Sequence, residues 1–187
     1  MTEIIHGAIL PAFHDCIAPS DDNRIRPYNL GDTISTGARM IFAKFLHILG
    51  FTVWVGGMFF AYMALRPVAA SRLAPEQRLP LWEGVFQKFF PWVWVAVALL
   101  LLSGLFMMAR MGKPPLHVII MFVIGIAMML IYAHIFFAPY KRLRDTVAQH
   151  DWPAAGAALG QIRKLIGTNL ILGLVTVCVG ALGQLTL

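Results

Sequence analysis

Apolar residues gather in four long stretches of this chain, and the polar residues between them form shorter connections. A helix needs about 20 mostly apolar residues, at about 1.5 Å of rise per residue, to cross the hydrocarbon core of a bilayer. Four stretches meet that requirement: residues 45–65, 89–108, 116–137 and 166–185. No alternation of apolar and polar positions that would indicate strands competes with them. The pattern predicts an all-α integral membrane protein, folded as a bundle of four transmembrane helices.

The two longer connections carry turn and helix-start signals. Residues 71–88 include Pro75 and Pro80 and are predicted to be loop. Residues 140–164 include Asp151-Trp152-Pro153, a sequence typical of an N-cap followed by a new helix. Trp82 and Trp152 lie near the predicted membrane surfaces, where tryptophan commonly anchors a membrane protein.

Residues 1–37 differ from the rest of the chain and are predicted to be a polar N-terminal tail. Their five acidic and two basic residues give a net charge of −3. Since the whole chain has a net charge of +6, the remaining residues carry +9. The tail has no basic start followed by an apolar core and a cleavage site, and is therefore not a secretory signal peptide. Residues 4–17 could form a short interfacial helix, and residues 20–37 are predicted to be loop. The sequence thus predicts two parts, 1–37 and the transmembrane domain 38–187.

Composition supports the membrane assignment and excludes several other classes. The chain is 59% hydrophobic and 13% charged, whereas a soluble domain has roughly 45–50% apolar and about 25% charged residues. Disorder, a disulfide scaffold and a nucleic-acid-binding module are excluded, so the predicted partner is the lipid bilayer. The positive charge is interpreted as flanking charge at the membrane surface.

Lysine and arginine near the ends of the predicted spans indicate an orientation. Nine of them lie on the side that holds the two longer connections, and six lie on the side that holds both termini. Because the more basic side of a membrane protein faces the cytoplasm, we expect both termini on the non-cytoplasmic side of a bacterial-type inner membrane.

Histidines at membrane depth are the main candidates for chemistry, because ionisable groups inside a span are costly. His47 and His117 lie near the starts of the first and third spans, which run in the same direction, so both imidazoles are expected at one depth. They could ligate one haem iron, bind another metal, or form hydrogen bonds at the interface. His134 follows His117 by 17 residues, roughly 25 Å along the helix. It therefore cannot join them, and its role is left open.

A second constellation involves methionine. Met107 and Met111 are one helical turn apart at the end of the second span, and His117 follows within six residues of Met111. Thioether and imidazole ligands suit Cu(I), although methionine also serves as flexible packing in apolar cores.

The remaining polar groups have both structural and functional interpretations. Arg66, Arg110 and Lys113 lie at span ends, where they could extend to the interface or pair with a haem propionate or an anionic substrate. Asn169 and Thr168 are interpreted as interhelical hydrogen-bonding groups. No motif for hydrolysis or phosphoryl transfer is present, and no catalytic residue is assigned.

Small residues are another feature with two interpretations. The glycines of the first, second and fourth spans could admit a flat macrocycle or allow close helix packing. They would also allow a homodimer. They are Gly50, Gly56, Gly57, Gly104, Gly173 and Gly180.

Several segments resemble CopD-like copper-resistance membrane proteins and the related HemJ-like protoporphyrinogen oxidases. They are Lys44-Phe-Leu-His47-Ile-Leu-Gly, Val-Trp54-Val-Gly-Gly57, Ala-Leu-Arg66-Pro67, Ser103-Gly104-Leu and Ile-Arg163-Lys-Leu…Asn169-Leu-Ile-Leu-Gly173-Leu. The resemblance covers about residues 38–187 and implies a four-helix membrane bundle in which His47 matches the histidine of the first helix. The lysine that HemJ-like proteins carry early in the third helix has no clear match, and His117 is the only candidate ligand nearby.

The residues and the resemblance together give two hypotheses. The first is a haem b protein with a redox role and an electron-transfer partner, in which His47 and His117 are axial ligands and Arg110 or Lys113 lies near the propionates. The alternative is a copper transport or copper homeostasis protein that uses Met107, Met111 and His117.

Overall fold

The computed structural model describes the backbone of residues 30–183 and the side chains of residues 35–183. The chain divides into two units, Met1–Gly37 and Ala38–Leu187. The interfacial helix expected at residues 4–17 lies outside the described residues.

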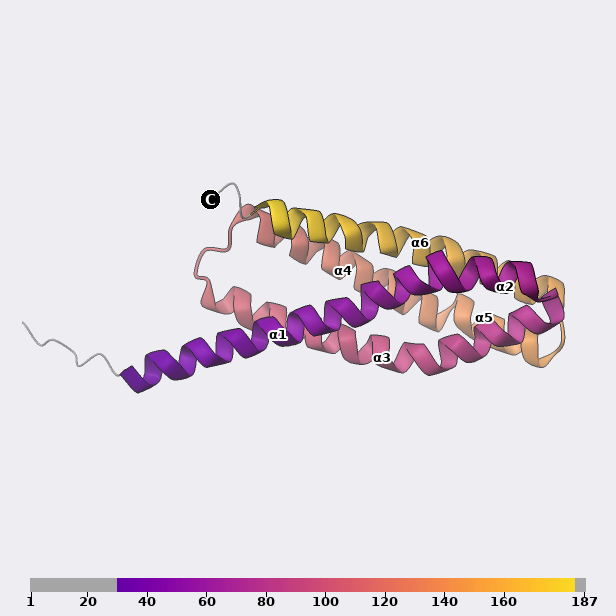
Figure 1. The fold of residues 1–187 in the computed structure, drawn as a ribbon, viewed down its shortest axis with the longest axis horizontal. Helices are drawn as coiled ribbons and strands as arrows, with labels where there is room; N and C mark the ends of the chain where they lie inside the picture. Colours follow the sequence, from indigo (N-terminus) through magenta and orange to yellow (C-terminus); the bar gives the residue numbers. More distant parts are fainter. Residues whose placement is uncertain (1–29, 184–187) are drawn as a thin grey trace, which may run out of the picture. The chain divides into compact units, whose positions relative to one another are not determined.

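The described chain is helical throughout, with short connections, and no strand occurs in residues 30–183 (Figure 1). The elements are α1 (Leu30–Phe60), the π-helix η1 (Ala61–Leu65), α2 (Arg66–Arg72), α3 (Pro75–Arg110), α4 (Leu116–Phe137), α5 (Pro139–Ala148) and α6 (Trp152–Leu182).

Four helical segments within residues 35–182 are long and apolar enough to cross a membrane, as the sequence predicts. They are Ser35–Arg72, Pro75–Arg110, Leu116–Ala148 and Trp152–Leu182. The third predicted span, 116–137, coincides with α4. The other three helices begin earlier than their predicted spans, so residues 30–37, 75–88 and 152–165 are helical. The loop predictions for 30–37 and for most of 71–88 are therefore wrong.

Local sequence signals explain where two of these helices start. Pro75 is in the first turn of α3, where the missing amide hydrogen costs no helical hydrogen bond. Asp151 precedes α6, and its side chain accepts a hydrogen bond from the amide of Ala154 at 3.1 Å. The predicted helix start at Asp151-Trp152-Pro153 is thus confirmed, and it lies 14 residues before the apolar stretch begins.

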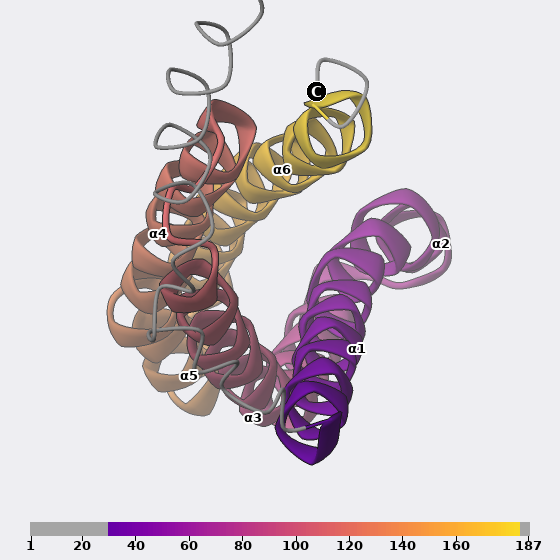
Figure 2. The same ribbon diagram turned by 90° about the vertical axis from the view of Figure 1, so that its left-hand side faces the viewer.

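Within Ala38–Leu187, α4 runs beside α6, and α1 lies against α3 (Figure 2). Glycines make these approaches possible. A Cβ added at Gly50 would lie 3.0 Å from the carbonyl oxygen of Ala96 on α3. One added at Gly173 of α6 would lie 3.0 Å from the side chain of Val55 on α1. The close-packing interpretation of these glycines is therefore confirmed.

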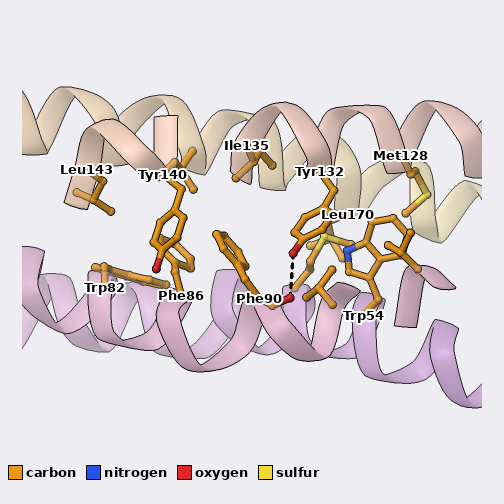
Figure 3. Close-up of a cluster of buried hydrophobic side chains, with 14 of the residues drawn as sticks. Trp54, Trp82, Phe86, Phe90, Met128, Tyr132, Ile135, Tyr140, Leu143 and Leu170 are labelled. Atoms are coloured by element: carbon orange, nitrogen blue, oxygen red, sulfur yellow. Dashed lines mark hydrogen bonds between the residues drawn. The ribbon is translucent and has the colours of Figure 1, made fainter. Parts of the chain in front are cut away.

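A cluster of aromatic and aliphatic side chains forms the core between the helices (Figure 3). The hydroxyl of Tyr132 on α4 donates to the carbonyl oxygen of Phe90 on α3 at 2.9 Å. Trp54 of α1 packs edge-on against the Tyr132 ring, with 6.0 Å between centroids. Leu170 of α6 belongs to the same cluster, so the core joins all four long helices.

Asn169 and Thr168 behave differently from each other. The Asn169 side chain donates to the carbonyl oxygen of Met128 at 3.3 Å, which links α6 to α4 as expected. Thr168 donates to the carbonyl oxygen of Lys164 within α6, so its interhelical role is wrong.

Candidate functional site

His47 lies in the middle of α1, where its ring is held against α3. Its Nδ1 atom is 2.9 Å from the hydroxyl oxygen of Ser103, and the Ser103 hydroxyl donates its own hydrogen to the carbonyl oxygen of Leu99. Since that hydroxyl has only one hydrogen, it accepts from His47, and Nδ1 carries the ring proton. The lone pair of the imidazole is therefore on Nε2, and this nitrogen is the one that could bind a metal.

Gly104 makes room for this ring. A Cβ added at Gly104 would lie 3.3 Å from Cε1 and 3.7 Å from Nδ1 of His47. Ser103 and Gly104 together thus form a fixed seat for the imidazole on α3, from which His47 cannot turn freely.

Two methionines continue the same side of α3 beyond Ser103. Met107 follows Ser103 by one helical turn, and Met111, the C-cap residue of α3, follows Met107 by four residues, so the three follow one side of the helix to its end. Exposure rises along this row: Ser103 is 5% exposed, Met107 is half-buried and Met111 is 45% exposed. The row leads from the surface at the end of α3 to the seat of His47, over about 12 Å at the helical rise.

His117 lies in the first turn of α4, at the same end of the bundle as Met111. It lies beside the end of α6, since a Cβ added at the C-cap residue Gly183 would lie 2.5 Å from Cβ and Cγ of His117. His47 is thus held against α3, whereas His117 lies beside the end of α6.

The other residues named from the sequence lie at the surface of the described chain. Arg110 is exposed, with its guanidinium 5.3 Å from the ring centroid of Phe106 on its own helix. Lys113 is exposed in the connection between α3 and α4. His134 is exposed in the last turn of α4.

A haem fits this arrangement poorly. Of the glycines that could admit a macrocycle, Gly56 has open space beside it, but the ring of Phe89 occupies the space at Gly57, and His47 itself occupies that at Gly104. The residues described here therefore do not form a haem site.

The fold and these residues define a multi-pass helical membrane protein with histidine and methionine at one end of the bundle. The chain belongs to the copper resistance protein D (CopD) family, whose family model matches residues 83–182, more than half of the sequence. The matched part covers most of α3 and all of α4 and α5, together with α6, whereas His47 lies outside it. No curated protein and no solved structure matches the chain.

Family membership makes this a copper-related membrane protein and favours the copper hypothesis over the haem hypothesis. Sequence reasoning had named His47, Met107 and Met111 but had placed them in competing sites. Ser103 was named only for the resemblance, and its contact with His47 was not predicted, because nothing in an apolar helix shows which side meets a histidine on another helix.

Proposed function

We propose that the protein binds Cu(I) as a cargo ion and moves or buffers copper in the membrane. The observation that carries this proposal is the contact of 2.9 Å between Nδ1 of His47 and the hydroxyl of Ser103, one helical turn from Met107. A neutral imidazole and soft thioethers are ligands that suit Cu(I).

The graded exposure of the α3 row supports a direction for the copper ion. Met111, at 45% exposure, would meet copper at the surface, and Met107 would pass it to Nε2 of His47 inside the bundle. Thioethers are uncharged, so they can hold copper in an apolar environment without burying an additional anion. His117, in the first turn of α4, is proposed as a further ligand at the entrance.

Titration of the purified full-length protein with Cu(I), against a coloured Cu(I) chelator, tests this proposal. We expect one tight site whose affinity falls at least about tenfold in His47→Ala and in Met107→Leu with Met111→Leu. His117→Ala is expected to weaken binding less than His47→Ala, because His117 packs against Gly183.

Met63→Leu with His134→Ala is the matched control, since it removes a thioether and an imidazole from exposed positions away from the α3 row. If this control loses as much affinity as the site variants, or if the wild-type protein competes for no Cu(I), the proposal fails.

The location of the protein is part of the proposal. We place it in a bacterial-type inner membrane with both termini on the non-cytoplasmic side, because the connections between η1 and α3 and between α4 and α6 carry more basic residues. Met111 and the end of α3 then face the non-cytoplasmic side, from which copper would enter.

A further inference from the structure

A second site lies at the other end of the bundle from Met111. A cavity of about 310 Å³ opens where η1 and α2, the start of α3 and the start of α6 meet. Its walls combine apolar and aromatic side chains, including Leu79, Trp82, Phe86 and Trp152. The copper proposal does not use this cavity.

Three arginines from three separate elements line the cavity: Arg66 of α2, Arg78 of α3 and Arg163 of α6. No carboxylate is among the residues that line it. Within residues 35–183, none of these guanidiniums forms a salt bridge. Three like charges around one cavity repel each other, and an anion bound among them would remove that cost.

One of the arginines is held in place by its surroundings. The π-helical turn of η1, in which the amide of Arg66 donates to the carbonyl oxygen of Ala61, precedes α2. The guanidinium of Arg66 lies 4.9 Å from the ring centroid of Tyr62. The Tyr62 ring in turn packs against Gly167 of α6, where an added Cβ would lie 3.2 Å away. Arg66 is thus positioned before any ligand arrives, which lowers the entropic cost of binding.

Glycines keep the α6 wall of the cavity open. Gly156 and Gly160 line it on successive turns, and a Cβ added at either would meet no atom within 4 Å. These two glycines are therefore not explained by close helix packing, unlike Gly50 and Gly173. Their effect is to leave unfilled space beside Arg163, one turn further along α6.

Two tryptophans line the cavity, as is common for sites at the membrane surface. Trp82 is 7% exposed and Trp152 is half-buried, and tryptophan is enriched at the level of lipid headgroups. Arginine matches phosphate oxygens with two parallel hydrogen bonds. We propose that this cavity binds a phosphate group carried by an amphipathic molecule, with the three guanidiniums on the phosphate and the aromatic wall on the apolar part. An acidic phospholipid and a soluble phosphate compound share this chemistry.

Binding of phosphatidylglycerol, phosphatidylcholine and inorganic phosphate to the full-length protein in detergent tests the proposal, with occupancy read by native mass spectrometry. The pocket variant is Arg66→Gln with Arg78→Gln and Arg163→Gln. The matched control is Arg72→Gln with Arg142→Gln and Arg144→Gln, which removes three positive charges from exposed positions outside the cavity. A second variant, Gly160→Leu, fills the cavity and leaves every arginine in place. It tests the same site if the triple pocket variant does not fold.

We expect phosphatidylglycerol to bind the wild-type and the control protein at least about tenfold more tightly than the pocket variant and Gly160→Leu. Displacement of the lipid by millimolar inorganic phosphate would identify a site open to soluble phosphate compounds, and lack of displacement would identify a lipid site. The proposal would be overturned if the control lost as much phosphatidylglycerol affinity as the pocket variant. It would also be overturned if the wild-type protein bound phosphatidylglycerol no more tightly than phosphatidylcholine and did not bind inorganic phosphate.

Discussion

At the scale of single residues, the position of the His47 ring depends on a serine whose contact with that ring cannot be read from the sequence. Ser103 is 5% exposed and fixes the ring proton of His47 on Nδ1 by accepting its hydrogen bond. Partners of this kind orient metal-binding histidines and commonly contribute about tenfold or more to metal affinity. The proposed copper site therefore depends both on His47 of α1 and on its hydrogen-bond partner on α3.

Replacing Ser103 tests this division of roles. In Ser103→Ala the imidazole loses its acceptor and its fixed tautomer, so we expect Cu(I) affinity to fall about tenfold with the helical content unchanged. Ser103→Thr keeps the hydroxyl and should retain most of the affinity. Chelator competition measures both variants, and a Thr variant as weak as the Ala variant would show that the hydroxyl is not what supports the ring.

At the scale of elements, adjacent glycines on α1 have opposite surroundings. A Cβ added at Gly57 would lie 2.2 Å from the ring of Phe89 on α3, whereas one added at Gly56 would meet nothing within 4 Å. Gly57→Ala must displace that ring, and we expect a loss of about 1–3 kcal/mol in the free energy of unfolding. Gly56→Ala is the matched control. Unfolding in mixed detergent measures both, and equal stability would contradict the packing described for α1.

The start of α6 offers a second test. Asp151 accepts a hydrogen bond from the Ala154 amide in the first turn of that helix. Asp151→Ala should cost about 1 kcal/mol, and Asp151→Asn should cost less because asparagine also caps helices well. Thermal unfolding of the three proteins gives the comparison. An alanine variant as stable as the wild-type would mean that the cap does not hold α6 in place.

Helix existence was predictable from the sequence, and helix length was less so. Residues 116–137 match α4 because both ends of that helix coincide with polar residues or proline. The starts of α1, α3 and α6 were harder to place. Hydropathy identifies only the apolar part of a helix that crosses the bilayer, and these three helices begin with polar residues that lie before that part. Pro80 indicated a loop, yet it lies inside α3 near its start. The contacts of His47 with Ser103 and of Arg66 with Tyr62 depend on helix rotation and on a π-helical turn.

At the scale of the whole molecule, orientation decides which end of the bundle meets copper from outside. A C-terminal alkaline phosphatase fusion should be active, and a fusion ending at His150, after α5, should be inactive. The reverse pattern would place Met111 on the cytoplasmic side and would make the proposed direction of copper movement wrong.

The family match also gives an expectation about colour. Because the chain belongs to the CopD family and the ring of Phe89 fills the space at Gly57, protein purified from haem-replete cells should show no Soret band. Absorbance of the purified protein checks this directly. A Soret band that disappears in His47→Ala would restore the haem hypothesis.

X-ray absorption at the copper edge of the Cu(I)-loaded, full-length protein tests the central claim most directly, because it reports the atoms bound to copper. We expect a mixed shell of sulfur and imidazole nitrogen, from which His47→Ala removes nitrogen and Met107→Leu with Met111→Leu removes sulfur. A shell without sulfur, or one that none of these substitutions changes, would contradict the assignment of copper to His47 and the methionine row of α3.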